Sequence, residues 1–194
     1  IKLIGFFIGA VILGITCFID DVKNIPALVK LAGQILAAAV VVATGTRIDN
    51  INIPFLQFYE LNEIFSIILT IGWIIGITNA INLIDGLDGL SSGITLIACL
   101  SLIIIFSLND SPLIAIILIT ALAGSLTGFL PFNFNPAKTF IGDTGSNFLG
   151  YCLAVISILG IAKTYTAIVI VAPLIVLALP VFVTIWAIIR RVIT

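Results

Sequence analysis

The sequence predicts an all-α integral membrane protein, a polytopic bundle of about seven transmembrane helices in one domain covering residues 1–194. Mean hydropathy is +1.36. Only 9% of the residues are charged, whereas about a quarter are charged in soluble domains. The apolar runs are long and uniform, whereas membrane β-strands alternate over about ten residues. A soluble domain with this composition would lack the polar residues needed to cover its surface.

Each predicted helix rests on the length of an apolar segment, because about 20 apolar residues span the hydrocarbon core. Seven segments, separated by short polar or Pro/Gly-containing breaks, meet this length: 1–19, 27–45, 62–83, 91–108, 112–131, 146–162 and 166–189. The intervening stretch TRIDNINIPFLQFYELNE alternates polar and apolar residues, breaks at Pro54 and then carries three aromatic residues. This pattern predicts a short interfacial hairpin near 46–60.

The charged residues separate by side of the membrane, since consecutive helices alternate in direction. One side receives five of the eight Lys and Arg residues, which makes it cytoplasmic by the positive-inside rule. Three loops far apart in the sequence also bring five aspartates to that side: Asp20 and Asp21, Asp85 and Asp88, and Asp143. The sequence therefore predicts an acidic cluster where helices end.

Clustered carboxylates need protons or cations, because two unit charges about 4 Å apart repel by about 4 kcal/mol at an effective dielectric of about 20. The chain has no histidine. An all-oxygen ligand set favours Mg²⁺, with Mn²⁺ as the other candidate. Nearby lysines and flanking glycines are typical of phosphate sites, where backbone amides approach the ligand closely. Together these features indicate phosphoryl transfer between a soluble nucleotide and a membrane lipid phosphate.

Other interpretations of these residues stay open at this point. Singly, the Asp pair at 20–21 could be a solvated loop, and Asp85 could cap a helix. An ion-coupled transporter also uses intramembrane carboxylates, although near the midplane and often with internal repeats. An intramembrane aspartyl protease would carry G-x-G-D, but Phe140 stands at the first glycine. A purely structural membrane protein has no reason to gather five aspartates. A net charge of −1 excludes nucleic acid as a partner.

Three long motifs resemble those of a known family, in order and over nearly the whole chain. The motifs are FIDDVKNIPALVKLAGQ (18–34), NAINLIDGLDGLSSG (79–93) and GFLPFNFNPAKTFIGDTGSNFLG (128–150). They are similar to the polyprenyl-phosphate N-acetylhexosamine-1-phosphate transferases, of the glycosyltransferase family 4 type. This resemblance implies Mg²⁺-dependent transfer of a sugar 1-phosphate from a UDP-sugar to undecaprenyl phosphate, with release of UMP, for synthesis of a cell-envelope polysaccharide.

The resemblance also implies a location and an architecture. These enzymes lie in the bacterial plasma membrane with the active site on the cytoplasmic side, and related enzymes are often homodimers. The family fold has ten or eleven helices, so the chain is expected to hold helices three to nine and to be truncated at both ends. The family's histidine-rich loop follows the ninth helix, so the fragment itself is expected to be weak or inactive.

Catalytic and metal-binding roles follow from the resemblance position by position. Asp20 matches the base that deprotonates the lipid phosphate, with Asp21 beside it. Asp85 matches a carboxylate that is interpreted either as a nucleophile or as part of the electrostatics of the metal site. Asp143 matches the principal Mg²⁺ ligand, and Asn82 an asparagine that joins the metal in some relatives.

The substrate-binding residues are implied in the same way. Lys30 matches a lysine near the diphosphate, Asp88 a contact to the uracil, and Asn24 and Asn133 polar residues that line the cleft. Lys138, in the triplet PAK, indicates UDP-N-acetylglucosamine as the donor. The alternative within the family is a phospho-N-acetylmuramoyl-pentapeptide transferase, which usually carries an acidic residue at that position.

Overall fold

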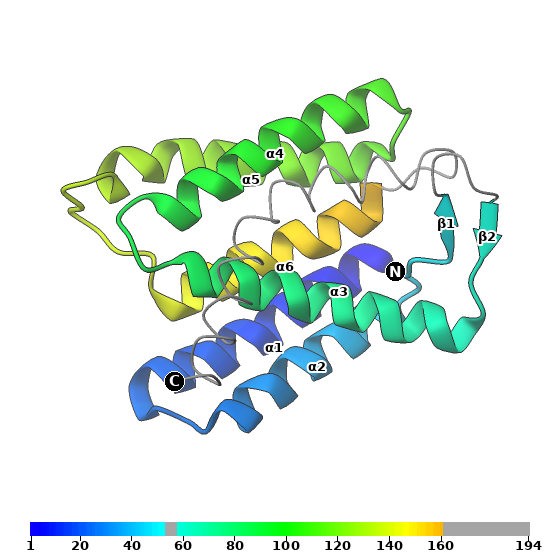
Figure 1. Cartoon of the computed structure of the whole chain (residues 1–194), viewed down its shortest axis with the longest axis horizontal. Helices are drawn as coiled ribbons and strands as arrows, with labels where there is room; N and C mark the ends of the chain where they lie inside the picture. The colour runs from blue at the N-terminus through cyan, green and yellow to red at the C-terminus, as the bar shows by residue number, and fades with distance from the viewer. Residues whose placement is uncertain (53–57, 161–194) are drawn as a thin grey trace, which may run out of the picture.

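The computed structural model of the chain describes residues 1–52 and 58–160 (Figure 1). Within these ranges the chain forms six helices and one two-stranded sheet. The elements are α1 (Lys2–Lys23), α2 (Ala27–Ala43), β1 (Asn50–Asn52), β2 (Phe58–Glu60), α3 (Glu63–Ile84), α4 (Leu90–Leu108), α5 (Leu113–Asn133) and α6 (Gly142–Gly160). The predicted helical membrane bundle is confirmed, and the seventh predicted segment, 166–189, lies outside the described residues.

The helices have the length and composition of membrane spans. Four of the described helices, α1, α3, α4 and α5, are long and apolar enough to cross a bilayer, and α2 is a shorter apolar helix of 17 residues. Large apolar side chains on the outside of α1, such as Phe7, Val11 and Phe18, are more than half exposed. Such an apolar exterior suits lipid as the surrounding solvent.

Helix α6 lies at the centre of the bundle and packs against α1, α3, α4 and α5 (Figure 1). Every residue from Leu149 to Gly160 is buried. Gly150 allows the closest approach to α3, since a Cβ atom added there would lie 2.7 Å from the Cα of Thr78. The Tyr151 hydroxyl donates a hydrogen bond to the carbonyl of Phe6, 2.9 Å away, and so ties α6 to α1.

The predicted hairpin near 46–60 is also confirmed. Strands β1 and β2 pair in antiparallel register, with Asn50 opposite Glu60. An ion pair between Arg47 Nη1 and Glu63 Oε1, 2.9 Å long, joins the hairpin to the start of α3. The hairpin lies at one end of the bundle, together with the α4–α5 turn (Figure 1).

The three acidic connections lie together at the opposite end. The α1–α2, α3–α4 and α5–α6 connections all appear on the left of Figure 1. This is the arrangement that helix alternation predicts. Residues separated by more than 100 positions in the sequence can therefore share one site.

Two helices extend further toward this end than the apolar segments predicted. Helix α1 continues to Lys23, where Asn24 ends it with a left-handed φ of 47°. Helix α6 begins at Gly142, which has a φ of 67°. Apolar segment length locates the hydrocarbon-crossing part of a helix, whereas backbone hydrogen bonding continues into the polar region until a residue breaks it. Three of the aspartates therefore lie on helix ends rather than in loops.

Candidate active site

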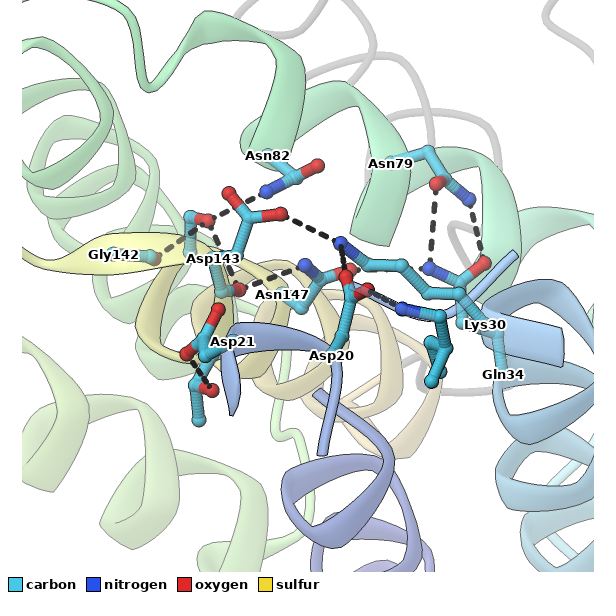
Figure 2. A network of polar contacts seen from close by, with 12 residues as sticks. Asp20, Asp21, Lys30, Gln34, Asn79, Asn82, Gly142, Asp143 and Asn147 are labelled. Carbon is cyan, nitrogen blue, oxygen red and sulfur yellow. Dashed lines mark hydrogen bonds and ion pairs between the residues drawn. The ribbon is translucent and has the colours of Figure 1, made fainter. Parts of the chain in front are cut away.

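A lysine bridging two carboxylates forms the centre of the site. Lys30, in the first turn of α2, places its Nζ 3.0 Å from Asp20 Oδ2 and 2.7 Å from Asp143 Oδ2 (Figure 2). The side chains of Lys30 and Asp20 are each 16% exposed, whereas that of Asp143 is 53% exposed. One ammonium thus joins α1, α2 and α6, and the Asp143 carboxylate faces the open side of the site.

Asp20 is held in an electrostatically unfavourable place by two compensating contacts. It lies in the last turn of α1, where the helix dipole disfavours a negative charge. Its Oδ1 accepts a hydrogen bond from the backbone N–H of Ile25, 3.1 Å away, and its Oδ2 pairs with Lys30. These contacts fix the direction of the carboxylate.

Asp143 occupies the opposite kind of position, in the first turn of α6, where the dipole favours an anion. The Asn82 side chain, from the last turn of α3, lies beside this carboxylate (Figure 2). Asn82 also donates from Nδ2 to Ser146 Oγ, 2.9 Å away. The two predicted metal ligands are therefore brought together, at a helix N-terminus of the kind that binds phosphates.

Asp21 has a different partner from Asp20. Its Oδ2 accepts a hydrogen bond of 2.6 Å from the hydroxyl of Thr144. This contact links the end of α1 to the first turn of α6, next to Asp143 in the sequence. Asp21 is therefore placed to hold α6 in position, while its neighbour Asp20 contacts Lys30.

Asp85 ends α3 and accepts a hydrogen bond from the Ser91 hydroxyl. Burial raises the pKa of the Asp85 carboxyl above its ordinary value, and the negative charge of Asp143 raises it further, while the bond from Ser91 lowers it.

Asp85, Asp88 and Asn133 line a cavity of about 110 Å³ beside this centre. Asp88 Oδ2 accepts hydrogen bonds from Asn135 Nδ2, at 3.1 Å, and from the backbone N–H of Ala137, at 3.0 Å. Asp88 therefore orders the loop after α5 in addition to facing the cavity.

Asn133 is almost fully buried. It accepts a hydrogen bond from Ser92 and donates from Nδ2 to the carbonyl of Thr139, 2.9 Å away. The turn between Asp85 and Leu90 is not helical, yet Asp85 and Asp88 line the same cavity.

Two predicted residues lie at the margin of the site. Asn24 caps α1 through its backbone N–H, which donates to the carbonyl of Asp20 at 2.8 Å. Lys138 is anchored by its backbone N–H to the carbonyl of Phe132, also at 2.8 Å. Both residues are exposed. Within the described residues, no hydrogen bond or ion pair joins either side chain to the other predicted site residues.

The prediction missed three amide side chains near the ion pairs: Gln34 hydrogen-bonds both to Asn79 and to Asn147 (Figure 2). A signal was available in the sequence, because each is a polar residue inside an apolar helix. Gln34 and Asn147 also lie four residues after Lys30 and Asp143, on the same helix faces.

The donor set fits a hard cation shared with a substrate. In the described part of the chain, no three His, Cys, Asp or Glu side chains converge as a protein-only metal cage. Mg²⁺ commonly uses one or two carboxylates and completes its shell with water and substrate phosphates. Asp143, about half exposed, provides such a carboxylate, and the Asn82 amide lies beside it.

Comparison with known proteins identifies the family. The sequence profile of glycosyl transferase family 4 matches residues 3–161. The chain belongs to glycosyl transferase family 4. It is 43% identical over 192 residues to the probable undecaprenyl-phosphate N-acetylglucosaminyl 1-phosphate transferase of Bacillus subtilis, covering 98% of this chain and 53% of that protein.

Two other relatives represent the two alternative branches of glycosyl transferase family 4. The decaprenyl-phosphate N-acetylglucosaminephosphotransferase of Mycobacterium leprae is 43% identical over 159 residues, covering 77% of this chain and 39% of that protein. The phospho-N-acetylmuramoyl-pentapeptide-transferase of Staphylococcus epidermidis is also 43% identical, but over 110 residues, covering 57% of this chain and 34% of that protein. The chain thus spans about half or less of the length of these relatives.

Proposed function

We propose that the full-length protein carrying this chain transfers N-acetylglucosamine 1-phosphate from UDP-N-acetylglucosamine to undecaprenyl phosphate, at the cytoplasmic face of the bacterial plasma membrane. The observation that carries the proposal is the convergence of Asp20, Lys30 and Asp143 from three helices at one end of a membrane bundle. A site at that depth can receive a nucleotide from water and a phosphate from the membrane.

In the proposed reaction, an oxygen of the lipid phosphate forms a bond to the β-phosphorus of the UDP-sugar. The bond between that phosphorus and the bridging oxygen breaks, and UMP leaves with the oxygen and its electron pair. Asp20 takes the proton of the lipid phosphate, and its bonds to Ile25 and Lys30 fix the direction of the accepting oxygen.

Asp143 and Asn82 would hold Mg²⁺ or Mn²⁺, and the bound ion would neutralise charge on the diphosphate. Lys30 supplies a fixed positive charge between the two carboxylates. The amides of the first turn of α6 favour an anion at the same place. Asp85, Asp88 and Asn133 line the adjacent cavity, beside which the nucleotide is proposed to bind, and Asn24 and Lys138 are exposed at the margin of the site.

N-acetylglucosamine is preferred as the transferred sugar for two reasons. Lys138 carries a positive charge where the muramoyl-pentapeptide branch usually has an acid. The two relatives named for N-acetylglucosamine cover 98% and 77% of the chain, whereas the relative named for the muramoyl pentapeptide covers 57%.

The proposal is tested by UMP release from UDP-N-acetylglucosamine and undecaprenyl phosphate in detergent micelles containing Mg²⁺. Asp143→Ala in the full-length protein should lower kcat by at least about 100-fold. The matched control is Asp110→Asn, which changes an exposed aspartate at the opposite end, where asparagine tolerates the φ of 49°. Its turnover should stay within about twofold of wild type.

Three outcomes would contradict different parts of the proposal. Near-normal turnover in Asp143→Ala would remove the metal assignment. Faster turnover with UDP-N-acetylmuramoyl-pentapeptide would change the sugar. Ion flux in proteoliposomes without any UMP formation would replace the transferase with a transporter.

A further inference from the structure

Gln34 joins three amide side chains into one hydrogen-bonded group, one helical turn further into the bundle than the site. Gln34 Nε2 donates to Asn79 Oδ1 at 3.3 Å and to Asn147 Oδ1 at 3.1 Å, and Asn79 Nδ2 donates back to Gln34 Oε1 at 2.8 Å. We call Gln34, Asn79 and Asn147 the amide triad. Its members come from α2, α3 and α6, the helices that carry Lys30, Asn82 and Asp143 (Figure 2).

Each member of the triad lies one helical turn below a site residue. Gln34 follows Lys30 by four residues, and Asn147 follows Asp143 by four. Asn79 precedes Asn82 by three residues, on a helix that runs in the opposite direction, toward the site. Residues three or four apart share one helix face, about 4.5–6 Å apart along the axis. The triad therefore repeats the arrangement of the site residues one turn deeper.

Nearly all hydrogen-bond donors of the triad have partners, and the triad carries no charge. Asn79 uses its second N–H for the carbonyl of Ile75, at 2.8 Å. Asn147 donates to the backbone carbonyl of Asp143, at 2.7 Å. Gln34 is 3% exposed and Asn147 is fully buried, so neither can touch a substrate in the site. Buried hydrogen-bonded amides fix geometry, and neutral amides do so without changing the charge balance of the ion pairs above them.

We propose that the amide triad is a positioning device for the transferase site, setting the separation and rotation of α2, α3 and α6 so that Lys30, Asn82 and Asp143 meet. The proposal rests on the proposed function for its catalytic readout. The direct link is Asn147, which bonds both to Gln34 on α2 and to the backbone of Asp143 itself. Without the triad, the described polar links among these helices would be the Lys30–Asp143 ion pair and the bond from Asn82 to Ser146, which lie in the site itself, and the distant bond from Trp73 to Ser157.

The test uses Gln34→Met in the full-length protein, which keeps the length of the side chain and removes all three of its hydrogen bonds. Asn147→Leu, of similar shape, is the second variant if the first does not fold. The control is Ser157→Ala, which removes the hydrogen bond from Trp73 Nε1, 3.1 Å long, between the same helices α3 and α6. Ser157 lies ten residues beyond Asn147, about 15 Å further along α6.

Three readouts separate positioning from general stability: thermal unfolding in detergent, steady-state kinetics and Mn²⁺ binding by electron paramagnetic resonance. We expect Gln34→Met to lower kcat by about 10–100-fold while KM for the nucleotide changes less than about threefold, because small misplacements of reacting groups act on the rate. The Kd for Mn²⁺ should rise by at least about threefold. Ser157→Ala should lower the unfolding temperature by a similar amount and leave kcat and Mn²⁺ binding within about twofold of wild type.

The proposal is overturned if folded Gln34→Met and Asn147→Leu both retain kcat and Mn²⁺ affinity within about twofold of wild type. The proposal is also overturned if Ser157→Ala lowers kcat and Mn²⁺ affinity as much as Gln34→Met does, because the losses would then reflect helix packing in general. A wild-type protein that binds Mn²⁺ but releases no UMP would contradict the proposed function alone. In that case the Mn²⁺ affinities of the variants still decide whether the triad positions Asp143 and Asn82.

Discussion

Replacing Lys30 with methionine should have opposite effects on the cation and on the nucleotide. The ammonium of Lys30 lies between two carboxylates, 3.0 Å from Asp20 and 2.7 Å from Asp143. Methionine keeps the unbranched apolar stem of the side chain and removes the charge. Both carboxylates then face each other without a counter-ion, and the diphosphate loses a cationic partner.

The size of the effect follows from these distances. Two oxygens that share one ammonium lie no more than about 6 Å apart, and like charges at about 6 Å repel by about 3 kcal/mol at an effective dielectric of about 20. Because the Asp143 side chain is 53% exposed, solvent screening reduces this to about 1–2 kcal/mol. About 1.4 kcal/mol corresponds to a tenfold change in affinity. A divalent cation that relieves the repulsion should therefore bind about tenfold more tightly.

Nucleotide binding should change in the other direction. A hydrogen bond to a charged group contributes about 1.5–3 kcal/mol, so losing Lys30 should raise KM for UDP-N-acetylglucosamine by about 10–100-fold. The assay pairs Mn²⁺ titration by electron paramagnetic resonance with UMP release. Lys23→Met is the control, since Lys23 is an exposed lysine in the last turn of α1. Weaker Mn²⁺ binding in Lys30→Met would refute the electrostatic reasoning, because it would mean that Lys30 supports the cation site.

Three further predictions concern neighbouring parts of the site. Ser91→Ala removes a hydrogen bond that lowers the pKa of Asp85, so the pKa of Asp85 should rise. The acid limb of the pH profile of kcat/KM should then move to higher pH. An unchanged acid limb would contradict a role for ionised Asp85. Gly150→Ala places a Cβ atom 2.7 Å from the backbone of α3 and should destabilise the protein by about 1–3 kcal/mol in thermal unfolding. The control is Gly14→Ala, whose added Cβ atom has no described atom within 4 Å and should be neutral or slightly stabilising. Asp88→Asn weakens two hydrogen bonds to the loop after α5 and should raise KM for the nucleotide more than it lowers kcat. A larger effect on kcat than on KM would instead place Asp88 in the chemical step.

The fold was largely predictable because membrane spans depend on segment length. Twenty apolar residues can satisfy their backbone groups in lipid only as a helix, so hydropathy alone locates α1 to α5 to within about two to four residues. The ends of α1 and α6 were less predictable. Asn24 and Gly142 end or begin these helices through single backbone conformations with positive φ, which hydropathy does not report.

The candidate site was predictable as a set of residue types, but its contacts were not. Helix alternation brings the three acidic connections to one end, and this alone groups Asp20, Asp85 and Asp143. Pairing of Lys30 with two of these carboxylates depends on the rotation of α2 about its own axis. That rotation is set by packing between helices, which the local sequence does not encode.

The directions of the helices supply a physical reason for two carboxylates on one lysine to take different roles. Asp20 ends α1, where the helix dipole disfavours its charge by about 0.3–1 kcal/mol, and Asp143 begins α6, where the dipole favours its charge by a similar amount. A carboxylate whose negative charge is stabilised suits a ligand for a divalent cation. A carboxylate whose described partners are Lys30 and the N–H of Ile25 suits the proton-accepting role that is proposed for Asp20.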